Sequence, residues 1–127
     1  MGEDTVERLM STELVTIAPD ASAADAAKRM LETGVSSILV VDDGRLAGLI
    51  TATDFVSLVR KNEPNDETPA SAFMTTEVVT IAPDDSIEEF AEPANRGYTH
   101  LPVVNEDGQL VGMVSTTDLT AYVSEQR

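Results

Sequence analysis

Apolar and polar positions follow one another in short runs that predict strands and amphipathic helices. Residues 23–33 carry apolar side chains at helical spacing, and a second helix is expected at about residues 53–61. Between them, residues 35–41 and 46–50 are apolar runs of a length that suits buried strands. The sequence Asp-Asp-Gly at 42–44 predicts a tight turn that joins these strands in antiparallel order. The first half of the chain therefore predicts a strand pair flanked by helices.

Nearly the same pattern occurs a second time. The string Gly-Leu-Ile-Thr-Ala-Thr-Asp from Gly48 to Asp54 returns as Gly-Met-Val-Ser-Thr-Thr-Asp from Gly112 to Asp118. Residues 12–22 match residues 76–86 almost residue for residue. Each of these copies predicts a very short strand at Val-Thr-Ile, a proline that stops it, and a serine that caps a helix. The chain is therefore an internal repeat, and each unit is predicted as strand, helix, strand, strand, helix.

The repeat predicts the domain boundaries and the fold class. We expect a first repeat at residues 1–61 with an N-terminal lead-in helix, a polar linker at 62–69, and a second repeat at 70–127. Pro93 falls inside a predicted helix, where it costs roughly 3 kcal/mol, so that helix should be kinked or shortened. A three-stranded sheet of this size cannot bury both faces alone, so the repeats should pack together. The predicted class is α/β (α+β), with two small three-stranded sheets and their helices related by pseudo-twofold symmetry.

Each repeat runs from its last strand into a helix at a Thr/Ser-x-x-Asp sequence, Thr51 to Asp54 and Ser115 to Asp118. The first N–H groups of a helix lack partners, so this junction suits either a capping side chain or a bound anion. Capping is the ordinary role of these residue types, but the duplication at matching positions gives more weight to a ligand site. The acidic turns at 42–43 and 106–107 are explained better by turn chemistry than by metal binding.

The charge of the chain limits its partners. Twenty-three acidic and eight basic residues give a formal net charge of −15, and the basic residues are scattered along the sequence. Such a surface repels nucleic acid phosphates and anionic lipid, so we expect neither nucleic acid nor a membrane as a partner. The scarcity of lysine resembles that of proteins from salt-loaded, halophilic cytoplasms, in which cations screen self-repulsion.

Catalysis and export both lack their usual sequence signals. The chain has no cysteine and one histidine, and no nucleophile–base pairing is visible, so we do not expect an enzyme. The acidic start Met-Gly-Glu-Asp lacks the basic and apolar regions of a signal peptide, and no apolar run reaches membrane-spanning length. The expected location is the cytoplasm.

The repeated motifs resemble a tandem pair of CBS domains, also called a Bateman module. They are Val-Thr-Ile-x-Pro-Asp, the string Gly-Tyr-Thr-His-Leu-Pro-Val-Val at 97–104, and the Gly-x-x-Thr/Ser-x-x-Asp endings, and the resemblance covers about residues 6–124. It implies a regulatory module that binds adenosyl ligands such as AMP, ADP, ATP or S-adenosylmethionine in two clefts between the repeats. It implies no other cofactor, and association into a disc-like homodimer.

The resemblance also assigns roles to residues. The Asp of each ending would accept hydrogen bonds from ribose hydroxyls, and the Thr or Ser three residues earlier would help to hold a phosphate. Each cleft would take residues from both repeats, and the Thr before each Asp departs from the usual motif and is a further candidate. One cleft would combine Thr51, Thr53 and Asp54 with Thr80, Ile81, Thr99 and His100, and the other would combine Ser115, Thr117 and Asp118 with Thr16, Ile17, Ser36 and Ser37.

Several alternatives stay open for these residues. His100 is either a cation that reaches ligand phosphate or a plain exposed or hydrogen-bonded histidine. Apolar residues of the clefts would flank the adenine ring or pack in the core, and the core is preferred for Leu39 and Pro102. The Asp54 cleft would contain His100, which can carry a positive charge, and Arg96 is near it in sequence. We therefore expect this cleft to favour phosphorylated nucleotides.

The competing function is a structural or protein-interaction module with vestigial clefts, in which the junction residues act only as caps. For either function, the module would act on an effector protein of unknown identity. The expected homodimer contact lies on the helices that follow the Asp motifs, because these helices carry more apolar residues than one small core needs: Phe55, Leu58, Val59, Leu119, Tyr122 and Val123.

Overall fold

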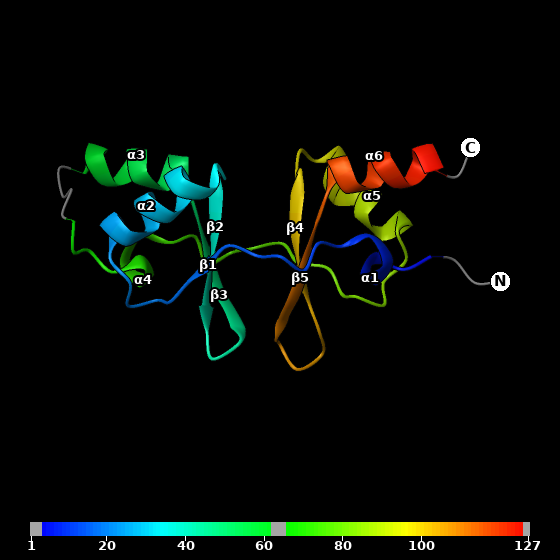
Figure 1. The fold of residues 1–127 in the computed structure, drawn as a ribbon, viewed down its shortest axis with the longest axis horizontal. Coiled ribbons are helices and arrows are strands. Elements are labelled where there is room, and N and C mark those ends of the chain that lie inside the picture. Colours follow the sequence, from blue (N-terminus) through cyan, green and yellow to red (C-terminus); the bar gives the residue numbers. More distant parts are fainter. Residues whose placement is uncertain (1–3, 62–65, 126–127) are drawn as a thin grey trace. The chain divides into compact units, whose positions relative to one another are not determined.

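The computed structural model describes residues 4–61 and 66–125 and contains helices and strands in mixed order (Figure 1). No helix in the described part of the chain is both long and apolar enough to cross a membrane. The elements follow the sequence as α1 (Val6–Leu9), β1 (Thr16–Ile17), α2 (Ala23–Thr33), β2 (Ser37–Asp42), β3 (Arg45–Thr51), α3 (Ala52–Arg60), α4 (Ala70–Phe73), α5 (Glu88–Asn95), β4 (His100–Val104), β5 (Leu110–Ser115) and α6 (Thr116–Glu125).

These elements form two compact units. We call residues 15–78 the central unit, and residues 1–14 together with 79–127 the terminal unit. In each unit the helices lie on one side of the small sheet (Figure 1). Each unit has its own hydrophobic cluster, centred on Ile38, Val40 and Ile50 in the central unit and on Phe90 and Leu101 in the terminal unit. The mixed α/β class expected from the sequence is confirmed.

The compact units do not follow the sequence repeats at their edges. The lead-in helix α1 packs in the terminal unit, where Val6 N–H donates to Asp85 O at 2.9 Å. Its counterpart α4 packs in the central unit, where Ala70 N–H donates to Ala21 O at 2.8 Å. Each repeat therefore takes its lead-in segment from the part of the chain that precedes the other repeat. The predicted boundaries at 1–61 and 70–127 describe the repeat in sequence, whereas the units at 15–78 and 1–14 with 79–127 describe the packing.

The predicted linker is in part a packed segment. Residues 62–65 lie outside the described residues, but 66–69 are placed against the start of α2. Ala23 N–H donates to Thr68 O at 2.7 Å and Ala24 N–H donates to Asp66 O at 3.0 Å, which gives partners to two N–H groups at the helix start. The Ser22 hydroxyl accepts from Asp25 N–H at 3.1 Å, as the sequence predicted.

The central unit contains the expected three-stranded sheet in the order β1-β2-β3. β1 is parallel to β2, and β2 is antiparallel to β3 with Ser37 opposite Thr51. The predicted turn at 42–44 is confirmed, since Asp43 and Gly44 have φ values of 53° and 80°, the left-handed conformations that a two-residue hairpin turn requires.

The sheet of the terminal unit is smaller than expected. β4 and β5 pair in antiparallel order, and the third strand is reduced to a single parallel bridge between Ile81 and Val103. In the central unit, Leu39 N–H donates to Val15 O at 3.2 Å and extends the pairing of β1. The matching position on β4 is Pro102, which has no N–H, so that hydrogen bond cannot form.

Proline also shortens a helix in the terminal unit. α5 has 8 residues and contains Pro93, whereas the matching helix α2 has 11 residues. Beyond the proline the chain turns, and the N–H groups of Arg96 and Tyr98 both donate to Pro93 O at 3.0 and 3.1 Å. The shortened helix predicted from Pro93 is confirmed.

Candidate functional site

The strand-to-helix junction of the central unit is built on a close approach between two segments. Thr75 pairs with Leu49 of β3 through two backbone hydrogen bonds of 2.8 and 2.9 Å. A Cβ on Gly48 would lie 2.7 Å from Met74 Sδ and 2.8 Å from Thr75 O, so only glycine fits beside this segment. The glycine of the repeated motif thus allows Thr75 to reach the end of β3.

The Asp54 carboxylate is held by several donors at this junction. Thr51 N–H donates to Asp54 Oδ2 at 2.8 Å, and Asp54 N–H donates to the Thr51 hydroxyl at 3.3 Å, which forms a reciprocal capping box. The Thr51 hydroxyl lies 3.2 Å from the same Oδ2, and the Thr75 hydroxyl donates to Oδ1 at 3.0 Å. Both carboxylate oxygens therefore have partners within the central unit.

The Asp118 junction of the terminal unit has the same cap with fewer donors. Ser115 N–H donates to Asp118 Oδ2 at 2.9 Å, and Asp118 N–H donates to the Ser115 hydroxyl at 3.1 Å. Ser11 occupies the position of Thr75 and pairs with Met113 through its backbone at 2.8 and 2.9 Å. Within the described part of the chain, no hydrogen bond joins the Ser11 hydroxyl to Asp118. Oδ1 of Asp118 is thus more open to an added donor than Oδ1 of Asp54.

In each unit, polar residues at the start of one strand lie beside the junction. Ser37 pairs with Thr51, and Ser36 O accepts from Ala52 N–H at 3.4 Å. In the terminal unit His100 pairs with Ser115, and Thr99 O accepts from Thr116 N–H at 2.9 Å. The structure therefore brings Ser36 and Ser37 to the Asp54 junction, and Thr99 and His100 to the Asp118 junction, within their own units.

The clefts predicted from the sequence join residues of different units. Placing Asp54 with Thr80, Thr99 and His100 stays a prediction, as does placing Asp118 with Thr16, Ile17, Ser36 and Ser37. Thr53, Thr80 and Thr117 are exposed, whereas Thr16 and Ile17 are half-buried.

Ile81 belongs to the core of the terminal unit. It is 6% exposed and packs in the cluster with Phe90 and Leu101. Its N–H donates to Pro102 O at 3.1 Å and its carbonyl accepts from Val104 N–H at 2.9 Å. Core packing, the alternative left open by the sequence, is therefore its role in the structure. Leu39 and Pro102 are also buried, which agrees with the core packing preferred for them from the sequence.

The cations considered from the sequence have polar neighbours of their own. His100 is exposed, and its Nδ1 lies 3.0 Å from the Thr99 hydroxyl. Arg96 forms an ion pair with Glu92 at 3.0 Å, and its guanidinium carbon lies 5.7 Å from the centre of the Tyr98 ring. No group of three or more metal-binding side chains occurs among the described residues.

Thr75 and Ser11 were not identified from the sequence. The signal was present, because Met74-Thr75 and Met10-Ser11 extend the repeat just upstream of the strings at 76–86 and 12–22. What the sequence did not show is that these residues pair with the strands that carry Gly48 and Gly112.

Comparisons with known proteins extend these observations. A family model described as "CBS domain" matches residues 6–61 and 70–125. Among curated relatives, the CBS domain-containing protein YhcV of Bacillus subtilis is 32% identical over 116 residues, which cover 91% of this chain and 82% of that protein. An uncharacterized 17.7 kDa protein of Acidianus ambivalens is 30% identical over 116 residues, covering 90% of this chain and 70% of that protein. Other relatives are longer, since the chain spans 25% of a homoserine O-acetyltransferase of Methanosalsum zhilinae at 30% identity.

Solved structures show the same fold. The CBS domain pair of protein MJ0100, in complex with 5′-methylthioadenosine and S-adenosyl-L-methionine, has a TM-score of 0.79 at 23% identity and covers 99% of this chain and 100% of that chain. CBSX2 in complex with AMP has a TM-score of 0.83 at 24% identity, with coverage of 97% and 98%.

Proposed function

The chain belongs to the CBS domain family, with two tandem copies of the domain, and we propose that it is a regulatory module that senses an adenosyl ligand. AMP, ADP, ATP and S-adenosylmethionine form the ligand class. The observation that carries this proposal is the duplicated junction, in which a carboxylate and a hydroxyl sit at the start of a helix in each unit. Structural neighbours that hold AMP, or S-adenosylmethionine and 5′-methylthioadenosine, support the ligand class.

The chemistry of the junction suits a ribosyl phosphate. A carboxylate only accepts hydrogen bonds and has about four lone-pair positions for them, so it suits the two hydroxyls of a ribose. The helix N-terminus, together with the hydroxyl of Thr51 or Ser115, suits a phosphate. Asp118 has the more open carboxylate, because Oδ2 accepts from Ser115 N–H and the described residues place no donor on Oδ1.

The second candidate function is an interaction module without a ligand. The contacts of Asp54 favour it at that junction, because three donor groups from Thr51 and Thr75 already satisfy its two oxygens. For either function we propose a non-catalytic protein whose output passes to an effector protein. Turnover of ATP or AMP on incubation with the purified protein would overturn the non-catalytic part of the proposal.

We further propose that the chain forms a homodimer through α3 and α6. Val56 and Val59 on α3 are 66% and 62% exposed, and Val123 on α6 is 49% exposed. Phe55 and Leu58, expected at this contact, instead pack within the central unit, since Phe55 stacks edge-on against Phe73 at 5.2 Å and Leu58 is buried. Light scattering in high salt should give the mass of two chains, and a monomer at micromolar concentration would contradict the dimer.

The ligand can be identified directly. Mass spectrometry of small molecules released from the purified protein should find an adenosyl compound. Calorimetric titration with AMP, ADP, ATP and S-adenosylmethionine then measures its affinity, and a ligand at a hundred times its Kd should stabilise the fold by about 2.7 kcal/mol. If none of the four compounds produces a heat of binding or a shift in Tm, the proposal of a ligand sensor is wrong and the interaction module is the preferred function.

Two matched variants test the junctions. Asp118→Asn and Asp54→Asn keep a side-chain oxygen for the helix cap but replace one acceptor with a donor. Each variant should weaken one binding event and leave the unfolding transition nearly in place. Unchanged AMP binding in both variants would show that these carboxylates do not hold the ribose.

A further inference from the structure

The two Asp carboxylates of the junctions differ in how many hydrogen bonds they can still accept. A carboxylate has about four lone-pair positions for donors. Three donor groups already lie on Asp54, namely Thr51 N–H at 2.8 Å and the Thr51 hydroxyl at 3.2 Å on Oδ2, and the Thr75 hydroxyl at 3.0 Å on Oδ1. Among the described residues, one donor lies on Asp118, Ser115 N–H at 2.9 Å. About one position is therefore left on Asp54, whereas about three are left on Asp118.

The Thr75 hydroxyl is held in place by the backbone around it. The N–H and the carbonyl of Thr75 both pair with Leu49 of β3, at 2.8 and 2.9 Å. Gly48 allows this approach, since a Cβ there would lie 2.8 Å from Thr75 O. Threonine is also branched at Cβ, which restricts rotation about χ1. The hydroxyl oxygen is therefore fixed beside Oδ1 of Asp54.

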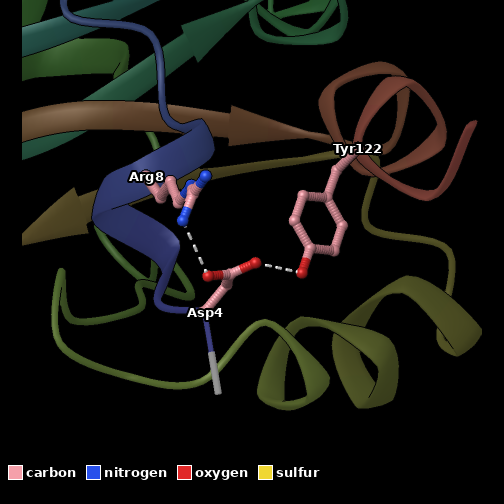
Figure 2. A network of polar contacts seen from close by, with 3 residues as sticks. All are labelled: Asp4, Arg8 and Tyr122. Atoms are coloured by element: carbon pink, nitrogen blue, oxygen red, sulfur yellow. Dashed lines mark hydrogen bonds and ion pairs between the residues drawn. The ribbon is translucent and has the colours of Figure 1, made fainter. Parts of the chain in front are cut away.

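The equivalent segment of the terminal unit is also anchored, but it carries serine. Ser11 pairs with β5 through two backbone hydrogen bonds of 2.8 and 2.9 Å. At the start of the same segment, the Tyr122 hydroxyl on α6 donates a hydrogen bond to the Asp4 carboxylate, which also pairs with Arg8 at 3.1 Å (Figure 2). The open carboxylate of Asp118 is thus not the result of a loosely held segment. The difference lies in the side chain of residue 11.

We propose that Thr75 competes with the ribose of the adenosyl ligand for the Asp54 carboxylate. The inference rests on the proposed function, in which each Asp accepts from ribose hydroxyls, and we call the two ribose positions the Asp54 site and the Asp118 site. Two hydroxyls need two positions on a carboxylate, which Asp118 has free, whereas Asp54 is one short while Thr75 is in place. One hydroxyl must then displace Thr75 or lose its charged acceptor. Thr75 thus lowers the affinity of the Asp54 site and its preference for a complete ribose.

Calorimetric titration with AMP tests the affinity. In the Asp118→Asn background, which weakens the Asp118 site, Thr75→Val should raise the affinity of the Asp54 site about fivefold, because a competing hydrogen bond is removed. In the Asp54→Asn background, Thr75→Val should leave the affinity of the Asp118 site unchanged. Thr76→Val is the matched control and should change neither affinity, since the described part of the chain shows no bond between the Thr76 hydroxyl and Asp54.

Analogues of AMP that lack one ribose hydroxyl test the selectivity. At the Asp118 site, 2′-deoxy-AMP and 3′-deoxy-AMP should each bind about tenfold more weakly than AMP, because a hydrogen bond to a charged group is lost. At the Asp54 site, one of the two should bind nearly as well as AMP, because the hydroxyl that it lacks has no free position on the carboxylate. Thr75→Val should restore the tenfold loss for that analogue. A purely structural role for Thr75 would not change this ratio.

The reciprocal variant adds the competing group to the terminal unit. Ser11→Thr should weaken AMP at the Asp118 site about fivefold, and it tests the competition independently should Thr75→Val not fold. AMP affinities that do not change in the folded variants, or equal losses for both analogues at the two sites, would overturn the role of Thr75 and leave the proposed function standing. Absence of AMP binding in the parent and in every variant would instead contradict the proposed function, and this inference with it.

Discussion

The two junctions should differ in how much their Asp residues contribute to stability. Replacing Asp118 by Ala removes one hydrogen bond from Ser115 N–H, and loss of such a cap costs about 1 kcal/mol. Replacing Asp54 by Ala removes the equivalent cap and also the bond that the Thr75 hydroxyl donates at 3.0 Å. This hydrogen bond is exposed, and a bond of that kind contributes about 1 kcal/mol. We therefore expect losses of about 2 kcal/mol for Asp54→Ala and about 1 kcal/mol for Asp118→Ala.

A double-mutant cycle isolates the Thr75 contribution. Thr75→Val keeps the shape of the side chain and removes the donor, so it should cost about 1 kcal/mol in the parent and almost nothing in the Asp54→Ala background. Ser11→Ala is the matched control in the terminal unit and should be nearly neutral. Urea unfolding followed by circular dichroism measures all of these free energies. Equal losses for the two Asp variants, or the same cost for Thr75→Val in both backgrounds, would refute the reasoning.

Three further predictions concern packing, pH and salt. Gly48→Ala and Gly112→Ala should each lower the free energy of unfolding by roughly 1–3 kcal/mol, because the new Cβ would lie 2.8 Å from the backbone oxygen of Thr75 and 3.0 Å from that of Ser11, respectively; unchanged urea midpoints would contradict this. The bond to Asp4 raises the pKa of Tyr122 above 10.0, so its stabilising effect is present below about pH 10 and is lost as pH rises through the folded-state pKa. Tyr122→Phe should therefore differ from the parent below pH 10 and converge with it above, as seen by thermal melts across that range; a constant difference would count against this. Stability should rise with salt, since the screening length falls from about 30 Å at 0.01 M to about 3 Å at 1 M and the net charge is −15; a Tm that does not change over that range would exclude strong self-repulsion.

Local patterns in the sequence were sufficient for most of the elements. The bounds of α2, the Ser22 cap and the turn at 42–44 were all predicted, because each depends on residues within a turn or two of one another. The Thr51–Asp54 and Ser115–Asp118 junctions were visible for the same reason, since a capping box spans only four consecutive residues. The repeated motifs then led to the resemblance to the CBS domain family.

Only the tertiary structure decided how distant segments meet. Nothing local indicates that α1 packs with the second repeat and α4 with the first, because the pairing of Ser11 with Met113 and of Thr75 with Leu49 joins residues far apart in the chain. The partners of the Asp54 carboxylate depend on that pairing, and so does the difference between the two junctions. The loss of the third strand in the terminal unit has a similar origin: Pro102 lacks an N–H in any context, but the missing bond matters only once β4 lies beside the segment that carries Ile81.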